Sequence, residues 1–197
     1  LAKEDADING DSLVNVSAEE RKKALVDYAL PKNIKKMQAD MEKYKIFYDK
    51  WFFESELHKS GAVQAVVDLL TEKGLTYEKD GAVWYKNKEV LTQKLLKEGK
   101  SQKYIDNLEL KDDVLIRQNG NPTYFTADIA YHKNKFDRGF TTLIDVWGAD
   151  HHGHVMRMKG AMDAIGYDGD KLNVVLMQLV KLVKDGELVR MSKRTGK

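Results

Sequence analysis

Residues 143–154 read L-I-D-V-W-G-A-D-H-H-G-H, an apolar run followed by a glycine, an aspartate and three histidines. The apolar run is typical of a buried strand. Beyond the cluster, apolar residues recur at the spacing of one helical face: Val155, Met158, Met162 and Ile165. Gly166 is well placed to end that helix. The polar cluster is therefore predicted to lie in a strand-to-helix crossover, where an α/β sheet opens its binding crevice.

The polar cluster allows three interpretations. As a metal site, Asp150 and the histidines after it supply suitable ligand types, and their order resembles that of metal-dependent phosphoesterases, which need further aspartates upstream. As a surface feature, three histidines at a helix start can simply be solvated. As a nucleotide site, the pair Gly148 and Asp150 gives room for a sugar and a carboxylate for both ribose hydroxyls. The cluster alone does not decide between them.

Composition bounds the class of protein. The 197 residues are 42% hydrophobic and 32% charged, the balance of a folded, soluble chain with one or two domains. No apolar segment reaches membrane-spanning length, and no signal peptide is recognisable. The absence of cysteine excludes a disulfide framework and a thiolate metal site. We expect a cytoplasmic protein, and its net charge of +2 does not by itself indicate nucleic-acid binding.

Residues 1–51 are predicted to form a helical segment. Ser17 and Glu20 form a capping box ahead of a first helix, and Pro31 is expected to kink or restart it. A strong amphipathic helix of about five turns is then predicted, with one face assigned to packing. Its apolar stripe is made of Ile34, Met37, Met41, Tyr44, Tyr48 and Trp51.

Residues 52–113 are predicted to be a small α+β connective insertion. Gly61 opens a helix that Gly74 closes, with one apolar face. That face comprises Val63, Val66, Val67 and Leu70. Asp80-Gly81 is a favoured two-residue turn between two short strands, and residues 89–98 have a helical pattern.

Residues 114–197 are predicted to form a second sheet with its helices. A strand at 114–117 turns and returns as a strand at 123–126, followed by a helix with Thr126 or Asp128 near its cap. Tyr124 lies four residues before Asp128, so both side chains could meet one ligand. The apolar run 172–183 is expected to be a buried parallel strand that continues into a more exposed one, and residues 184–187 form a turn.

A second motif resolves the choice. Residues 189–193, V-R-M-S-K, resemble the K-M-S-K-S signature loop of class I aminoacyl-tRNA synthetases, and they lie about forty residues beyond the Gly-x-Asp crossover. Four blocks look like bacterial-type arginyl-tRNA synthetases in particular: 122–132, 134–136, 145–153 and 185–194. The resemblance implies the second half of a Rossmann-like class I synthetase catalytic fold, with helices and the connective insertion.

The resemblance also implies a two-step reaction. Arginine and ATP give arginyl-adenylate and pyrophosphate, and the arginyl group then passes to tRNA. Carried over by position, the arginine site comprises Tyr124, Asp128 and His151, with Asp128 as counter-charge of the guanidinium. The ATP site comprises Gly148, Asp150, His154 and Met191. The catalytic group comprises Lys193, Arg190 and Ser192, which would neutralise charge on the phosphates. Expected partners are arginine, ATP with Mg²⁺ and tRNA, with no protein-bound metal and a monomeric state.

The chain departs from the family pattern in two ways. Arg190 and Arg194 replace the first lysine and the last serine of the signature loop, which keeps or adds positive charge. The family's other signature, a histidine pair of the form H-x-G-H, should lie upstream; residues 151–154 have its letters but stand in the second half of the fold. We therefore expect a piece without the first catalytic half and the anticodon-binding domain, inactive alone. A metal-dependent phosphoesterase or a non-catalytic tRNA-binding module remain alternatives.

Overall fold

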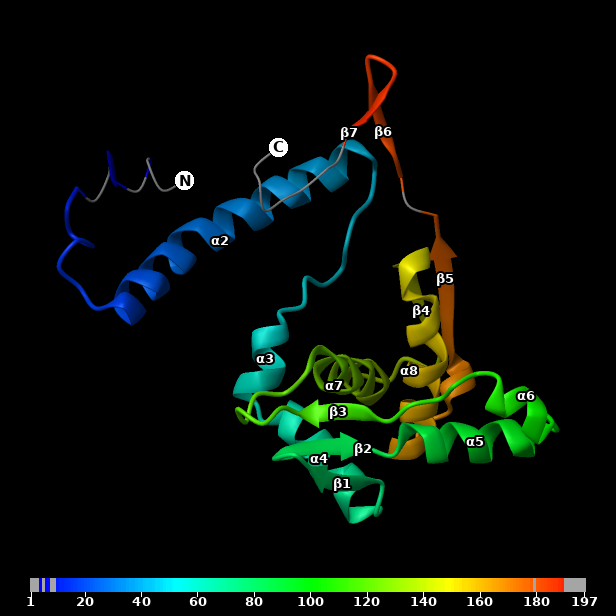
Figure 1. The fold of residues 1–197 in the computed structure, drawn as a ribbon. Helices are drawn as coiled ribbons and strands as arrows, with labels where there is room; N and C mark the ends of the chain where they lie inside the picture. Colours follow the sequence, from blue (N-terminus) through cyan, green and yellow to red (C-terminus); the bar gives the residue numbers. More distant parts are fainter. Residues whose placement is uncertain (1–3, 5, 8–9, 179, 190–197) are drawn as a thin grey trace. The chain divides into compact units, whose positions relative to one another are not determined.

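The computed structural model describes residues 4, 6–7, 10–178 and 180–189 (Figure 1). The chain divides into two compact units, Leu1–Phe52 and Phe53–Lys197, each of which is described by itself. Helices and sheets are mixed in the second unit, as an α/β protein requires. In the described part of the chain, no helix is long and apolar enough to cross a membrane.

The first unit is dominated by one helix, α2 (Ala18–Lys43), which begins with the predicted capping box. Ser17 and Glu20 cap each other's backbone N–H groups. The helix does not restart at Pro31, which lies inside the continuous α2. The predicted extension to Trp51 is also wrong. Lys45 has a positive φ of 61°, and the helix ends there in a Schellman motif.

The stripe assigned to packing on α2 is not buried. None of the side chains of α2 is buried, and Tyr44 and Tyr48 beyond its end are exposed. The amphipathic spacing therefore predicted a helix correctly as far as Lys43, whereas the assignment of its apolar face to a core is wrong for this chain.

The second unit begins with two helices and a three-stranded antiparallel sheet ordered β1-β2-β3. The predicted apolar face of α4 is buried, and Asp80 and Gly81 both have positive φ, as a two-residue hairpin turn requires. Helix α5 confirms the helical pattern at 89–98, while α6 was not predicted. The elements are α3 (Glu54–Lys59), α4 (Ala62–Glu72), β1 (Thr76–Lys79), β2 (Ala82–Tyr85), α5 (Asn87–Lys97), α6 (Gln102–Asp106) and β3 (Asp113–Ile116).

The predicted return strand at 123–126 is instead the start of helix α7 (Tyr124–Asp137). Thr123 caps the helix, and its hydroxyl donates to the Val114 carbonyl at 2.8 Å. The Thr126 hydroxyl donates to the Leu115 carbonyl at 2.7 Å. The two hydroxyls thus tie the start of α7 to β3, and the backbone pairing left on this side is the Thr123 N–H to Leu115 carbonyl bond at 2.8 Å and one bridge between Ile116 and Pro122.

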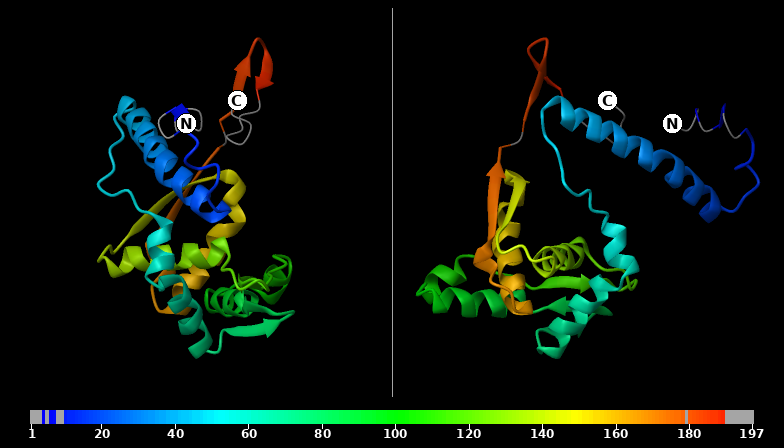
Figure 2. Two further views of the ribbon diagram at one scale, coloured as in Figure 1. Left: turned by 90° about the vertical axis from the view of Figure 1, so that its left-hand side faces the viewer. Right: turned by 180° about the vertical axis from the view of Figure 1, so that it is seen from behind.

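A second sheet carries the crossover. Strands β4 (Leu143–Gly148) and β5 (Leu172–Met177) pair in parallel, with Val146 opposite Val175, and Figure 2 shows them side by side. Between them run η1 (Ala149–His151), α8 (His152–Ile165) and η2 (Gly169–Lys171). The predicted end of α8 at Gly166 is confirmed by a left-handed cap with φ of 100°. Strands β6 (Leu182–Lys184) and β7 (Glu187–Val189) form a separate hairpin.

The expectation of a fully buried crossover strand is wrong. Leu143 and Asp145 of β4 are buried, whereas Ile144 and Val146 are 68% and 67% exposed. Alternate side chains of a strand point to opposite faces, so only one face of this two-stranded sheet is covered. The covered face is the one that meets helix α7, since His132 of that helix contacts Asp145.

A close approach of backbone to backbone holds η2 against α8. A Cβ built on Gly169 would lie 2.3 Å from the carbonyl oxygen of Lys159, which cannot move without disturbing the helix. The Gly169 N–H also donates to the Asp163 carboxylate at 2.7 Å. Only glycine fits this corner between α8 and β5.

We therefore predict that Gly169→Ala lowers the free energy of unfolding by about 1–3 kcal/mol, the usual cost of forcing atoms into a packed site. Urea denaturation would measure the loss. Gly153→Ala is the matched control, because no atom lies within 4 Å of its added Cβ. Equal urea midpoints for Gly169→Ala and Gly153→Ala would show that the contact between η2 and α8 tolerates a side chain at position 169.

Candidate functional site

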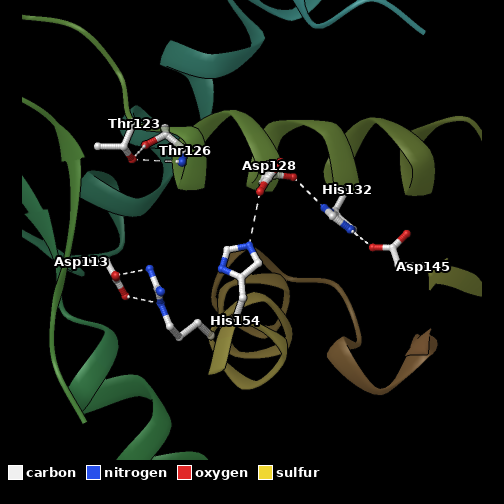
Figure 3. A network of polar contacts seen from close by, with 8 residues as sticks. Asp113, Thr123, Thr126, Asp128, His132, Asp145 and His154 are labelled. Carbon is white, nitrogen blue, oxygen red and sulfur yellow. Dashed lines mark hydrogen bonds and ion pairs between the residues drawn. The ribbon is translucent and has the colours of Figure 1, made fainter. Parts of the chain in front are cut away.

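Polar side chains of two helices meet beside the carboxyl end of β4 (Figure 3). Asp128 lies in the first half of α7, and its Oδ2 is 3.3 Å from Nε2 of His154 in α8. The Asp128 side chain is 48% exposed and that of His154 is 17% exposed. The pair is therefore shielded on the histidine side and open to a ligand on the carboxylate side.

Aromatic rings surround the histidine of this pair. The His154 ring lies 5.2 Å from Trp147 and 5.6 Å from Phe125, measured between centroids. Trp147 also contacts the rings of His132 and His151, each at 6.4 Å. Trp147 stands at the end of β4 and so forms the wall shared by three histidines. The sequence analysis missed it; its position directly before Gly148 was the available signal.

A buried polar network lies beneath the carboxylate. His132 approaches the backbone carbonyl of Asp128 with Nδ1 at 2.7 Å and the Asp145 carboxylate with Nε2 at 2.5 Å. Lys135 donates to the other oxygen of Asp145 at 2.8 Å. His132 and Asp145 are 3% and 8% exposed. The sequence analysis missed this network too, although an acid within an apolar strand was a visible signal.

Charge in this network follows from the carboxylate. Burial alone would raise the pKa of Asp145, but hydrogen bonds from His132 and Lys135 outweigh it and hold that pKa below its usual value. The carboxylate is therefore ionised at neutral pH and can only accept. Nδ1 of His132 thus faces the Asp128 carbonyl and its Nε2 faces the Asp145 carboxylate, so both ring nitrogens are engaged within the network.

A second ion pair anchors α8. Arg157 donates to both carboxylate oxygens of Asp113 on β3, and its guanidinium lies 4.8 Å from the centre of the Phe125 ring. Burial raises the pKa of Asp113, and Arg157 offsets only part of that effect. The bidentate geometry fixes one face of α8 against the three-stranded sheet.

Three other predicted site residues are more exposed than Asp128 and His154: Tyr124, Asp150 and His151. Tyr124 is 78% exposed and begins α7, one turn before Asp128. Asp150 and His151 lie in η1, with 4.0 Å between the carboxylate Oδ2 and the ring Nε2. Gly148 ends β4 in an extended conformation.

Four predicted residues, Arg190, Met191, Ser192 and Lys193, lie outside the described residues. The structure brings Asp128 and His154 together, although the sequence analysis assigned them to different ligands. In the described part of the chain, no three side chains of histidine, aspartate or glutamate are grouped so that they could hold a metal ion. The phosphoesterase alternative therefore has no ligand set among these residues.

The chain is similar over nearly its whole length to curated arginine–tRNA ligases. It is 55% identical over 197 residues to that of Caldanaerobacter subterraneus subsp. tengcongensis, covering 100% of this chain and 32% of the relative. It is 52% identical over 191 residues to that of Ruminiclostridium cellulolyticum, covering 96% of this chain and 31% of the relative. No family model matches the chain.

Solved structures agree with this similarity. A protein of Campylobacter jejuni assigned as an arginyl-tRNA synthetase superposes with a TM-score of 0.74 at 35% identity, covering 96% of this chain and 37% of that one. The arginyl-tRNA synthetase of Thermus thermophilus shares the fold, with a TM-score of 0.61 at 18% identity over 81% of this chain and 32% of that one. The chain thus spans about a third of the length of its curated relatives, and it belongs to the arginyl-tRNA synthetase family.

Proposed function

We propose that this chain supplies part of the catalytic region of an arginine–tRNA ligase, which activates arginine with ATP and transfers it to tRNA. The observation that carries the proposal is the half-exposed carboxylate of Asp128 beside the Gly-x-Asp crossover, in a chain 55% identical to such ligases. The parallel pair β4 and β5 with α8 between them would be part of the second half of a Rossmann-like fold.

The arginine subsite centres on Asp128. Its carboxylate has one oxygen against His154 and is otherwise open, so a planar guanidinium can approach it with two donors. Tyr124 lies one helical turn earlier on α7, where its ring and hydroxyl can flank the substrate. His151 would line the same pocket beside Trp147, whose ring lies 6.4 Å from its own.

The nucleotide subsite would lie at the crossover. Gly148 leaves room for a sugar, and the exposed carboxylate of Asp150 can accept from both ribose hydroxyls. The start of α8 has no side-chain cap and adds the positive end of its helix dipole. Met191 would contact the nucleotide, and Lys193, Arg190 and Ser192 would stabilise the phosphates of ATP, which binds with Mg²⁺.

The division into 1–51, 52–113 and 114–197 stays a prediction. The boundary at 113/114 falls within β3, which pairs with β2 of the connective insertion. Cytoplasmic location, a monomeric state and a non-catalytic tRNA-binding role also stay predictions.

In a full-length ligase that contains this chain, we expect Asp128→Ala to raise the KM for arginine at least tenfold. A hydrogen bond to a charged group contributes about 1.5–3 kcal/mol, which corresponds to a factor of about 10–150. Arginine-dependent ATP–pyrophosphate exchange would measure KM. Asp137→Asn, at the far end of the same helix, is the control and should leave KM unchanged. Equal arginine KM values for wild type and Asp128→Ala would remove Asp128 from the pocket.

We expect the isolated chain to show no arginine-dependent ATP–pyrophosphate exchange, because the upstream histidine signature of the class is not found in its 197 residues. Exchange above background would contradict this. Calorimetric titration with arginine tests the subsite separately. Arginine binding that disappears in Asp128→Ala would show a preformed amino-acid pocket. If the wild-type chain gives no binding heat with arginine, the pocket needs further parts of the ligase.

A further inference from the structure

The carboxylate proposed to bind arginine already has a partner within the protein. Nε2 of His154 lies 3.3 Å from Oδ2 of Asp128, as Figure 3 shows. The histidine side chain is only 17% exposed and lies against Trp147 and Phe125, so its ring cannot swing freely into solvent. A guanidinium that binds Asp128 must therefore share the carboxylate with this ring.

We propose that His154 belongs to the amino-acid site: its neutral ring donates to Asp128 and orients the carboxylate for arginine, whereas its protonated ring competes with the guanidinium. The proposal rests on the proposed function, since it takes Asp128 as the arginine counter-charge. It moves His154 from the adenosine ribose, where the sequence placed it, to the arginine side of the site.

The charges around His154 favour this competition. Asp128 on α7 is its direct partner, and Asp113 on β3 also acts on it through space. Arg157 on its own helix is already engaged with Asp113 through two hydrogen bonds, so that pair adds little net charge. When the His154 ring is neutral, the Asp128 carboxylate has no positive partner, and the guanidinium of arginine can supply one. When the His154 ring is protonated, the carboxylate already has a positive partner, and the guanidinium is repelled by the ring.

The neighbouring histidines do not offer the same effect. His132 contacts the backbone carbonyl of Asp128 and the Asp145 carboxylate, so both of its ring nitrogens are engaged within the buried network. His151 is largely exposed on η1, with its Nε2 4.0 Å from the Asp150 carboxylate and its ring 6.4 Å from that of Trp147. His154 is therefore the ring in direct contact with the Asp128 carboxylate.

The test compares wild type with His154→Gln in a full-length ligase that contains this chain. Glutamine can donate to Asp128 at every pH but cannot gain a charge. As the pH falls from about 8 to 5, the span over which histidine side chains in general change charge, the wild-type arginine KM should rise, by at most about tenfold per pH unit for one competing proton. His154→Gln should lose most of that rise, while both enzymes keep the same KM for ATP.

Two further variants separate orientation from charge. His154→Ala removes the donor and should raise the arginine KM at every pH, whereas His154→Gln should restore it at high pH. His154→Asn serves as a second neutral donor if the glutamine variant folds poorly. His58→Gln is the matched control: His58 pairs with Glu54 at the same 3.3 Å, but on the exposed helix α3, and its loss should not change the pH profile.

The outcomes distinguish this inference from the proposed function. An unchanged acid rise of arginine KM in His154→Gln, or an effect confined to the KM for ATP, would overturn the role of His154. Asp128→Asn tests the premise separately, because it removes the carboxylate charge. If Asp128→Asn raises arginine KM while His154→Gln behaves as wild type, only the inference about His154 fails. If Asp128→Asn leaves arginine KM unchanged, the proposed arginine site itself is wrong.

Discussion

The buried pair of His132 and Asp145 joins helix α7 to strand β4, and the geometry of the site depends on it. A carboxylate on the covered face of a strand is costly unless its oxygens are bonded, and here both are, to His132 and Lys135. The second nitrogen of His132 bonds the carbonyl of Asp128. The strand that ends in the Gly-x-Asp crossover is therefore linked by one ring to the residue proposed to bind arginine.

The second constraint is the bidentate pair of Arg157 and Asp113, which holds α8 against the three-stranded sheet. Phe125 is in contact with both the Arg157 guanidinium and the His154 ring. Helix α8 is thus fixed at its site-facing side by one ion pair and one aromatic contact. These contacts place His154 3.3 Å from Asp128, with its side chain 17% exposed.

Elements with strong local signals could be predicted from the sequence. Gly61 and Gly166 mark the start of α4 and the end of α8, and Asp80-Gly81 fixes a hairpin, because each position needs the left-handed backbone that these residues adopt. Tertiary contacts decide the rest. Helix α7 starts early because the hydroxyls of Thr123 and Thr126 bond to β3, and α2 is closed by the left-handed conformation of Lys45, just beyond its last residue Lys43.

The same division applies to the site. Motifs predicted Asp128 and Asp150 as site residues because each stands at a recognisable place in its own strand–helix unit. They could not identify the contact between Asp128 and His154, which are separated by 26 residues and meet only through the packing of α7 on α8. That contact changes the chemistry expected of the carboxylate. A lone aspartate would bind a guanidinium at any pH at which it is ionised, whereas one that shares its charge with a histidine binds most strongly while the histidine is neutral.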